Sequence, residues 1–449
     1  MGKIFGTDGV RGLANAQLDG MLAFKLGQAG AYVLTREKYR PKILIGRDTR
    51  LSGDMLEAAI VAGICSVGAE AVVAGVVPTP AVAYLTRHYG ADAGVVISAS
   101  HNSMEYNGIK FFDYRGYKLP DEMEERIESI IFENTEALPL PVGIEIGRRV
   151  RARDVTRDYI DFLVSTVNGS KLDGLKAVVD CANGAAFEVA PKVLSKLGVQ
   201  VIPIHDDPDG ININLHCGST HPERLMSHVL ETGSDIGLAF DGDADRLILV
   251  DEHGKLVDGD LIMAICGISM HSRGILSRST VVATVMSNLG LDIALKKAGC
   301  NIVKTKVGDR YVLEEMLNQG YNFGGEQSGH LIFLDHNTTG DGILTALQIM
   351  SIMKGSDKSL SKLSSVMTKL PQVLANAKVN DDKKAALSDD PVIQQEIKNI
   401  ELKFMGNGRV LIRESGTEPL IRVMIEGPDQ TTVERYAYQL ARLIEQRLG

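Results

Sequence analysis

Short apolar segments alternate with longer segments of helical periodicity along the first two thirds of the chain. The apolar segments are four to eight residues long and end at charged or glycine residues, as in residues 42–46 (Lys-Ile-Leu-Ile-Gly). Short apolar runs bounded in this way are typical of buried strands. Strands that alternate with helices predict an α/β fold.

Three successive segments repeat this pattern, and in each the predicted strands lead to a polar or glycine-rich loop. Ligands of open α/β sheets bind beyond the carboxyl ends of the strands, so these loops are candidate site elements. The predicted strands and loops are 42–46, 71–75 and 93–98 with loop 98–107; 177–181, 199–204 and 236–240 with loop 241–246; and 280–285 and 301–306 with loop 324–330.

The last 80 or so residues have a different pattern. Residues 368–390 are polar and are predicted to be linker in part, whereas 409–413 and 420–425 read as two strands around a turn. Residues 431–448 place apolar side chains on one helical stripe, which predicts a small α+β module. With a length of 449 residues, the pattern predicts four domains: α/β domains at 1–150, 151–254 and 255–367, and an α+β domain at 368–449.

Composition narrows the functional classes. The net charge of −9 and the lack of long basic runs argue against a nucleic-acid partner. We expect a soluble cytoplasmic protein without a membrane partner, because no apolar segment is long enough to span a bilayer and no secretory signal begins the chain. The five cysteines are scattered without a C-x-x-C pair, which indicates neither a zinc site nor a disulfide framework.

An acidic loop is the strongest chemical signal. Asp241, Asp243 and Asp245 follow a predicted strand at alternate positions, where their carboxylates can converge on one hard cation such as Mg²⁺. An EF-hand would add Glu252 as its twelfth residue, but it needs glycine at the sixth position, where this chain has Arg246. A solvated acidic turn is the other alternative. Packing three like charges beside a buried strand argues against it.

A second loop contains a candidate nucleophile. Residues 98–102 read Ser-Ala-Ser-His-Asn, and Ser100 would need activation or prior phosphorylation to react. His101 and Lys110 could supply protons or positive charge. No G-x-S-x-G elbow surrounds the serine, which disfavours an esterase. An ordinary turn around Asn107-Gly108 stays open as the alternative.

A third loop, residues 324–330, reads Gly-Gly-Glu-Gln-Ser-Gly-His. Its glycines allow a close backbone approach, and Glu326 and Ser328 are suited to the hydroxyls or amine of a sugar. It matches neither a Walker loop nor G-x-G-x-x-G. A simple hairpin turn is the alternative.

Two further segments contain arginines near glycines. Arg413, Ser415, Gly416, Thr417 and Arg422 combine guanidinium, hydroxyl and backbone donors, which predicts a phosphate cradle. Its alternative is a surface hairpin. Arg11 lies within residues 6–12 (Gly-Thr-Asp-Gly-Val-Arg-Gly), where a flexible terminal loop is the alternative.

Together, these motifs in this order resemble the α-D-phosphohexomutase superfamily, and the likeness extends from Gly6 to Arg422. Within the superfamily the chain is most similar to bacterial members that act on glucosamine phosphates. The stretches that carry this similarity are residues 6–12, 97–102 (Ile-Ser-Ala-Ser-His-Asn), 325–330 (Gly-Glu-Gln-Ser-Gly-His) and 338–342 (Thr-Thr-Gly-Asp-Gly).

The resemblance implies three similar α/β domains with mixed sheets and a smaller C-terminal α+β domain around a central cleft. It also implies a role for each candidate residue. Ser100 would be the phosphorylated residue, and one of its phosphate oxygens would hold one Mg²⁺ together with Asp241, Asp243 and Asp245. The other implied roles are sugar binding by Glu326 and Ser328; phosphate binding by Arg413, Ser415, Gly416, Thr417 and Arg422; Arg11, Lys110, Arg246 and His330 around the transferring group; and proton transfer by Lys110 or His101.

The implied activity is the interconversion of glucosamine 6-phosphate and glucosamine 1-phosphate. The resemblance implies glucosamine 1,6-bisphosphate as intermediate and activator, and a product that feeds UDP-N-acetylglucosamine and cell-wall synthesis. The same chemistry on glucose or mannose phosphates is the alternative, and a phosphosugar sensor without turnover is a more distant one. The sequence does not determine the oligomeric state, so a homodimer stays open.

Overall fold

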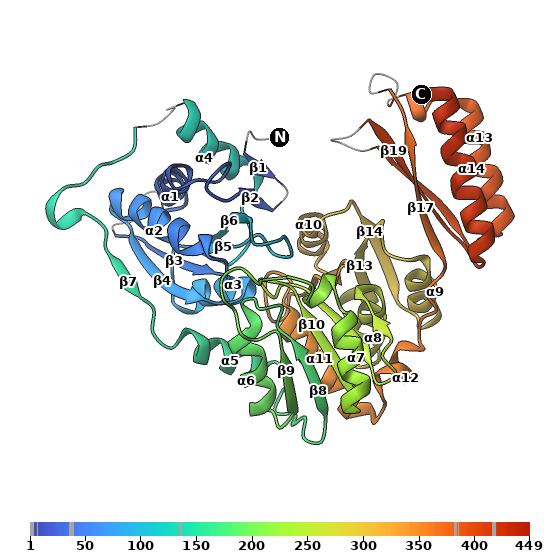
Figure 1. The fold of residues 1–449 in the computed structure, drawn as a ribbon, viewed down its shortest axis with the longest axis horizontal. Coiled ribbons are helices and arrows are strands. Elements are labelled where there is room, and N and C mark those ends of the chain that lie inside the picture. Colours follow the sequence, from blue (N-terminus) through green and yellow to red (C-terminus); the bar gives the residue numbers. More distant parts are fainter. Residues whose placement is uncertain are drawn as a thin grey trace. The chain divides into compact units, whose positions relative to one another are not determined.

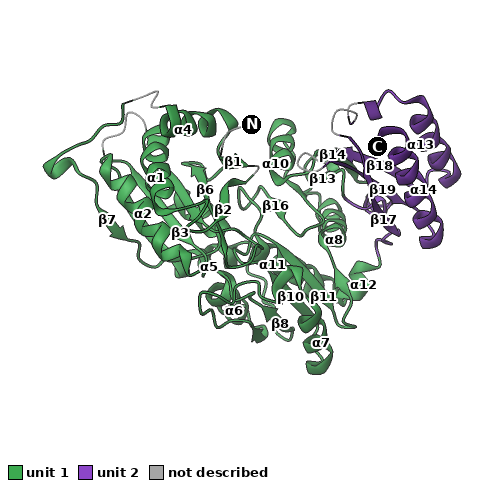
Figure 2. Ribbon diagram, turned by 45° about the horizontal axis from the view of Figure 1, so that its top comes forward, with its two compact units in different colours: residues 1–286, 300–365 green, residues 287–299, 366–449 purple. Residues whose placement is uncertain are grey.

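The computed structural model describes residues 4–6, 8–35, 40–133, 137–380, 384, 386–414 and 419–449. Its internal contacts divide the chain into two compact units (Figure 2). The first unit comprises Met1–Met286 and Cys300–Ser365, and the second comprises Ser287–Gly299 and Val366–Gly449. Within the described part of the chain, no helix is both long and apolar enough to cross a membrane.

Strands and helices alternate along the first unit, as the periodicity predicts. The first segment contains β1 (Phe5–Gly6), β2 (Gly9–Leu13), α1 (Gly20–Thr35), β3 (Lys42–Arg47), α2 (Ser52–Ser66), β4 (Glu70–Val76), α3 (Thr79–His88), β5 (Ala93–Ile97), β6 (Tyr106–Asp113), α4 (Asp121–Glu133), η1 (Gly143–Glu145) and β7 (Arg149–Arg151). The second contains α5 (Val155–Ser165), β8 (Lys176–Asp180), α6 (Ala186–Lys196), β9 (Gln200–Ile204), η2 (Gly218–Thr220), α7 (Glu223–Thr232), β10 (Ile236–Phe240), β11 (Leu247–Asp251) and β12 (Leu256–Val257). The third contains α8 (Gly259–Ser272), η3 (Ser277–Ser279), β13 (Thr280–Thr284), β14 (Asn301–Thr305), α10 (Asp309–Gln319), β15 (Phe323–Gly325), β16 (Leu331–Phe333), α11 (Gly342–Ser356) and α12 (Leu360–Ser364).

The three sheets of this unit share one topology. Figure 1 labels β3 to β6 of the first sheet, β8 to β10 of the second, and β13 and β14 of the third. Their common strand orders are β4-β3-β5-β6, β9-β8-β10-β11 and β14-β13-β15-β16. In each, three parallel strands are followed by an antiparallel fourth. The candidate loops therefore join the third and fourth strands in all three sheets. Pairing of Ile97 with Ile109, Phe240 with Leu247 and Gly325 with Leu331 closes these hairpins.

Helices cover both faces of the first sheet. Ile43 and Ile45 of β3 pack in a core cluster with residues of α1, α2 and α4. Gly46 and Gly94 belong to the opposite face, where a Cβ on either would come within 3.1 Å of Val82 on α3. Because successive strand residues point to opposite faces, this alternation produces the buried, helix-covered sheet that the apolar runs predict.

Glu252 lies immediately after β11 and does not join the acidic loop. Its carboxylate accepts hydrogen bonds from the Ser361 hydroxyl and, at 3.1 Å, from the Ser361 amide in the first turn of α12. The acidic loop itself lies between two strands, β10 and β11. Both observations exclude the EF-hand.

The Glu252 contacts predict a pH-dependent contribution to stability. Burial alone would raise the pKa of Glu252, but hydrogen bonds from Ser359 and Ser361 outweigh it and lower the pKa to about 2, from 4.5. A lowered folded-state pKa stabilises the fold above pH 4.5, and this contribution is lost as the pH falls through 2. Glu252→Gln should therefore reduce the free energy of unfolding by about 1 kcal/mol at pH 7.

Urea unfolding across the acid range measures this effect, and the difference between variant and parent should shrink progressively below pH 4.5. Glu231→Gln, which changes an exposed glutamate on α7, is the matched control and should differ little from the parent at any pH. If the unfolding free energies of Glu252→Gln and the parent differed by the same amount at every pH, the lowered pKa of Glu252 would be contradicted.

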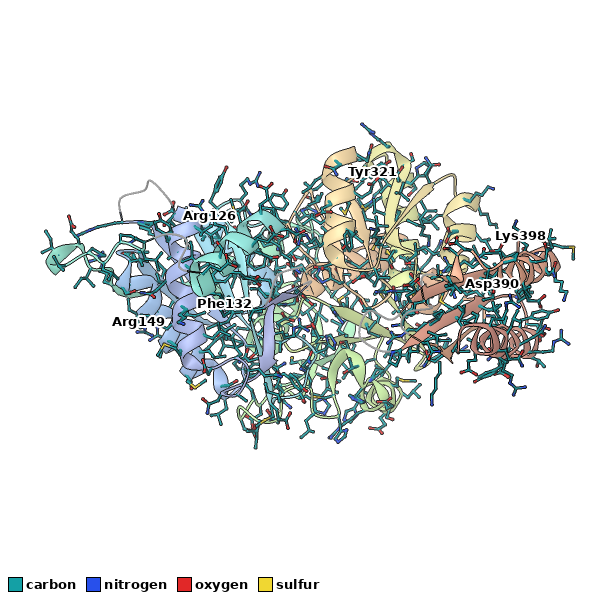
Figure 3. The ribbon with its side chains drawn as sticks, turned by 90° about the horizontal axis from the view of Figure 1, so that it is seen from above. Arg126, Phe132, Arg149, Tyr321, Asp390 and Lys398 are labelled. Atoms are coloured by element: carbon teal, nitrogen blue, oxygen red, sulfur yellow. The ribbon has the colours of Figure 1, made fainter. Side chains whose placement is uncertain are left out.

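The second unit contains a three-stranded sheet with helices packed on it. Its elements are α9 (Leu289–Lys297), β17 (Gln372–Lys378), α13 (Pro391–Phe404), β18 (Arg409–Glu414), β19 (Leu420–Glu426) and α14 (Gln430–Leu448), and the strand order is β17-β19-β18. Asp390 caps α13 by accepting from two backbone amides, and Lys398 lies farther along the same helix on its exposed side (Figure 3). The strands predicted at 409–413 and 420–425 and the terminal helix are all present.

One strand of this region was not predicted. The polar stretch 368–390, expected to be linker in part, contains the regular strand β17. Its residues from Leu374 to Lys378 alternate between exposed and buried, as expected of an edge strand with one face on the core. Two of its three inward residues are alanines, Ala375 and Ala377, so hydrophobicity alone gives little signal.

Candidate active site

The loops after β5 and β10 meet in the first unit. The Ser100 hydroxyl donates a 2.6 Å hydrogen bond to Asp241 Oδ2, and both residues are almost completely buried. His101 Nδ1 lies 3.2 Å from the same hydroxyl oxygen. A candidate nucleophile, a candidate proton carrier and the acidic loop therefore share one small space.

The Ser100 loop is held in an uncommon conformation. Ser100 has a φ of 52°, in the left-handed region that a residue with a side chain rarely adopts. Its amide donates to the Ser98 hydroxyl at 2.9 Å, and its carbonyl accepts from Asn214 Nδ2 at 2.9 Å. Gly242 allows this approach, because a Cβ there would lie 2.6 Å from the Ser100 carbonyl oxygen.

Arg50, which the sequence did not single out, organises the same loop. Its guanidinium is fully buried and forms an ion pair of 2.9 Å with Asp48. It also donates to four backbone carbonyls, those of Ser100, Asn102, Ser103 and Tyr106. A planar group with five donors suits this task in a way that lysine does not.

The three aspartates form a buried carboxylate cluster whose candidate ligand atoms lie within 4.8 Å of one another. Burial raises the pKa of Asp241 well above its ordinary value, and the charges of Asp245 and Asp243 raise it further. One oxygen each of Asp243 and Asp245 is buried without a hydrogen-bond partner among the described residues. Unpaired buried oxygens are costly, so the cluster fits a hard divalent cation.

Two residues of the first segment, Thr79 and Lys110, hold the Asp243 side chain in place. The Thr79 hydroxyl donates to Asp243 Oδ2 at 2.7 Å, and the Thr79 amide donates to the Asp243 carbonyl at 3.0 Å. Lys110 Nζ lies 3.1 Å from Asp243 Oδ2 and 2.9 Å from Asp8 Oδ2. Burial alone would lower the pKa of Lys110, but the Asp243 and Asp8 carboxylates outweigh it and raise the pKa, so the amine stays charged.

Asp8, Lys118 and Asp309 extend this charge network, and sequence analysis did not identify them. Asp8 contacts Lys110, Lys118 and, at 2.8 Å, Arg11, while Lys118 also pairs with Asp309. Asp8 lies inside the motif of residues 6–12 that contains Arg11, so the sequence offered a reason to consider it. Lys118 and Asp309 lie in different segments of the chain and belong to no motif, so the sequence did not point to their pairing.

Arg11, Arg246 and His330, which the resemblance assigns to the surroundings of the transferring group, lie near the serine loop and the aspartates. Arg11 Nη1 donates to Asn102 Oδ1 at 3.3 Å, and Arg246 Nε lies 3.8 Å from Asp245 Oδ1. His330 Nδ1 lies 3.5 Å from Asp245 Oδ2, and Arg246 and His330 form an isolated antiparallel bridge. All three segments of the first unit therefore contribute to one site.

His101 is the candidate base closest to the serine hydroxyl. Burial lowers the pKa of His101 to about 4, and the nearby charges of Arg246 and Arg11 act in the same direction. The imidazole is therefore neutral near pH 7 and able to accept a proton.

The third loop differs slightly from its prediction. Gly324 and Gly325 belong to β15, so the loop proper is 326–330. Gly324 allows close strand pairing in the sheet, because a Cβ at this position would lie 2.6 Å from the Val282 carbonyl oxygen. The loop lies beside the acidic loop, since Leu247 donates to the Gly329 carbonyl at 3.0 Å.

Two polar side chains of this loop were predicted to bind sugar. Glu326 accepts from the Gly308 amide at 3.0 Å. The Ser328 hydroxyl oxygen is buried without a hydrogen-bond partner among the described residues, which leaves it available for a ligand.

The predicted phosphate cradle lies in the second unit. Ser415, Gly416 and Thr417 fall outside the described residues. Arg413 and Arg422 are direct partners across β18 and β19, and both are exposed. Side chains of directly opposed residues point to the same face of the sheet, so the two guanidinium groups lie on one exposed face.

Family models match the chain in four consecutive parts. They describe the phosphoglucomutase/phosphomannomutase alpha/beta/alpha domain I at residues 2–138, domain II at 157–254, domain III at 258–370 and the C-terminal domain at 374–443.

Curated relatives and solved structures agree with these models. The phosphoglucosamine mutase of Clostridium acetobutylicum is 62% identical over 447 residues, and that of Acetivibrio thermocellus is 60% identical over 450, each covering 100% of both chains. A phosphoglucomutase/phosphomannomutase family protein from Burkholderia thailandensis has a TM-score of 0.81 at 24% identity, covering 99% of this chain and 97% of its own. The N-acetylphosphoglucosamine mutase of Aspergillus fumigatus, solved with GlcNAc-6P and magnesium, has a TM-score of 0.68 at 18% identity, covering 100% and 96%.

The fold matches solved phosphohexomutases, and the sequence matches curated mutases over its whole length. A metal cofactor is a property of this family, and the buried aspartates provide a place for it. The chain therefore belongs to the phosphoglucomutase/phosphomannomutase family and, within it, to the phosphoglucosamine mutases.

Proposed function

We propose that this mutase interconverts glucosamine 6-phosphate and glucosamine 1-phosphate, with Ser100 carrying the phosphoryl group and glucosamine 1,6-bisphosphate as the intermediate. The observation that carries the proposal is the 2.6 Å contact between the Ser100 hydroxyl and the acidic cluster. It supports a phosphoryl carrier beside a metal site, which is the arrangement that phosphoryl transfer requires.

Mg²⁺ is the cation that we assign to Asp241, Asp243 and Asp245. It would supply charge neutralisation beside the Ser100 phosphate. Lys110, Arg246 and Arg11 add fixed positive charge around the transferring group, and Lys110 stays charged because Asp243 and Asp8 flank it. This supports an electrostatic role for Lys110 and leaves proton transfer to His101, whose nitrogen is 3.2 Å from the serine oxygen.

Sugar and phosphate recognition complete the proposal. Glu326 and Ser328 would hydrogen-bond the sugar, and the buried Ser328 oxygen without a partner supports this role. Arg413, Ser415, Gly416, Thr417 and Arg422 would hold the non-reacting phosphate. The opposed arginines support that part, because two guanidinium groups on one face of the sheet can both donate to a phosphate.

The proposal keeps four domains, at 1–150, 151–254, 255–367 and 368–449. It places the enzyme in the cytoplasm, where its product feeds UDP-N-acetylglucosamine and cell-wall synthesis. A homodimer is compatible with the proposal and is not required by it.

Asp243→Asn should weaken metal binding by at least about tenfold, since one ligand charge is lost. Activity measured against Mg²⁺ concentration should show the half-maximal value rising accordingly. Asp251→Asn is the control, because Asp251 ends β11 and accepts hydrogen bonds from the backbone amides of His253 and Lys255 in the turn that follows. An unchanged magnesium dependence in Asp243→Asn would remove this residue from the metal site.

The substrate assignment predicts a rate comparison. With Mg²⁺ present, kcat/KM for glucosamine 6-phosphate should exceed that for glucose and mannose 6-phosphates by about tenfold or more, because a site that bonds the amine leaves polar groups unpaired with the other sugars. A coupled assay of sugar 1-phosphate formation measures all three. Equal rates would favour a broad phosphohexomutase, and no turnover of any sugar would favour the sensor alternative.

A further inference from the structure

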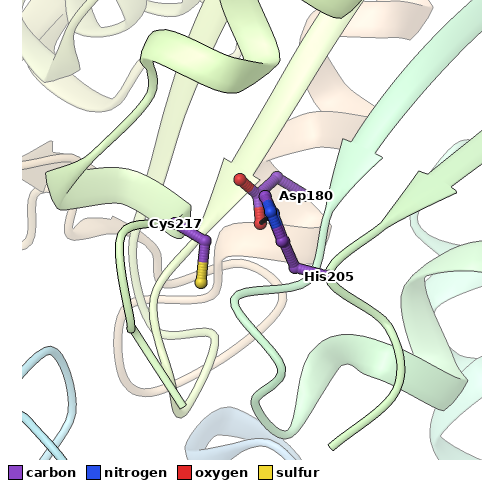
Figure 4. A group of neighbouring side chains, drawn as sticks. All are labelled: Asp180, His205 and Cys217. Atoms are coloured by element: carbon purple, nitrogen blue, oxygen red, sulfur yellow. Dashed lines mark ion pairs between the residues drawn. The ribbon is translucent and has the colours of Figure 1, made fainter. Parts of the chain in front are cut away.

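A second group of metal-ligand side chains lies in the second sheet of the first unit. Asp180 ends β8, His205 directly follows β9, and Cys217 immediately precedes η2 (Figure 4). One candidate ligand atom from each residue lies within 4.8 Å of the others. Three segments therefore bring a carboxylate, an imidazole and a thiol together at the carboxyl end of parallel strands.

The carboxylate of this group is fixed in place by backbone amides. Asp180 Oδ1 accepts from the Ala182 amide and Oδ2 from the Gly218 amide, each at 2.9 Å. Each oxygen keeps a further lone pair, because a carboxylate has about four acceptor sites. Such outer bonds hold a ligating carboxylate in one orientation, as is usual in metal sites.

Of the other two side chains, Cys217 is buried, whereas His205 is partly buried and has a buried ring nitrogen. His205 Nδ1 lies 3.0 Å from Asp180 Oδ1, yet it is buried without a hydrogen-bond partner among the described residues. Cys217 is a free cysteine and is 0% exposed. The His205–Asp180 contact is therefore close but is not a hydrogen bond, and a partner other than the Asp180 carboxylate would satisfy the His205 nitrogen.

We propose that Asp180, His205 and Cys217 form a second metal site that binds Zn²⁺. Thiolate and imidazole donors select zinc over magnesium, whereas the Asp241 cluster offers oxygen alone. Tetrahedral zinc spaces its ligands roughly 3.3–3.8 Å apart, given bonds of about 2.0–2.3 Å. The present spacing, between 3.0 Å and 4.8 Å, needs only small side-chain movements.

The site would stabilise the scaffold of the Ser100 loop. The Asn183 amide donates to the His205 carbonyl at 2.7 Å, and the Asn214 amide donates to the Ala182 carbonyl at 2.9 Å. Asn214 in turn donates its side chain to the carbonyls of Ser100 and Asn102. A cation that joins Asp180, His205 and Cys217 therefore ties together the segments that position the candidate nucleophile.

Sequence spacing did not predict this site. Because the chain has no C-x-x-C pair, its sequence indicated no zinc site. Asp180 and His205 lie at the ends of neighbouring parallel strands, which pairing in space brings together.

Cobalt titration of the full-length protein, stripped of metal by dialysis against a chelator, tests the proposal. Co²⁺ at this site should produce a near-ultraviolet thiolate-to-cobalt charge-transfer band that saturates at one equivalent, and added Zn²⁺ should abolish it. Co²⁺ at the Asp241 cluster gives no such band, because that cluster contains no sulfur. Asp243→Asn should therefore retain the band, which separates this test from the proposed function.

Two variants assign the ligands. Cys217→Ser should lose the band, whereas Cys65→Ser, which changes a partly buried cysteine on α2, should retain it. His205→Gln keeps the thiol and should weaken Co²⁺ binding by about tenfold or more; it serves if circular dichroism shows that Cys217→Ser does not fold. No charge-transfer band in the parent, or an unchanged band in Cys217→Ser or unchanged affinity in His205→Gln, overturns the proposal.

Discussion

Replacing Ser100 with alanine should abolish turnover, by at least about 10⁴-fold, while the protein stays folded. Loss of a covalent nucleophile leaves only binding and electrostatic effects, which cannot replace the bond it forms. The fold should persist, because the hydrogen bonds of this side chain within the described residues are those to Asp241 and His101. Formation of sugar 1-phosphate measures the loss, and urea unfolding verifies the fold.

Ser103→Ala is the matched control for this change, because Ser103 is an exposed serine of the same loop. It should retain most of the activity. Mass spectrometry of freshly isolated parent protein should find phosphate on Ser100 in a fraction of molecules and none there in Ser100→Ala. Full activity of the Ser100→Ala variant would rule out this serine as the phosphoryl carrier.

Arg50→Met should cost about 3–5 kcal/mol of unfolding free energy, because it leaves the Asp48 carboxylate buried without its partner. Four carbonyls of the Ser100 loop also lose the Arg50 donor, and of these the Ser100 and Asn102 carbonyls keep their bond from Asn214. We expect turnover of the folded fraction to fall as well, since the serine is no longer held at its position. Urea unfolding and single-turnover rates measure the two effects separately.

The double variant Arg50→Met with Asp48→Asn should recover part of the stability but not the rate, because the charge is removed while the loop stays unsupported. Arg47→Met changes a neighbouring arginine whose partners Asp54 and Glu57 lie on α2, and it should cost about 1 kcal/mol or less. Equal losses for Arg47→Met and Arg50→Met would show that Arg50 has no special role.

The strands and the loops between them were predictable because the buried parallel strands are continuous apolar runs. The local spacing of Asp241 and Asp243 identifies them as candidate metal ligands. The roles of Arg50 and Asp309 could not be predicted in this way, since they depend on partners 50 or more residues away in the chain: Ser100 for Arg50 and Lys118 for Asp309. Strand β17 was missed because alanines fill much of its inward face, and the role of Gly324 follows only from its sheet neighbours.

The opposed Arg413 and Arg422 have a consequence for how the C-terminal sheet responds to its surroundings. In the proposed function, a phosphate held by both guanidinium groups would bridge the two neighbouring strands. Anion binding and strand pairing would then be thermodynamically linked, so the hairpin would become more stable as the concentration of the anion rises. Charge-assisted bridging of this kind weakens with ionic strength, so the linkage would be smaller at high salt.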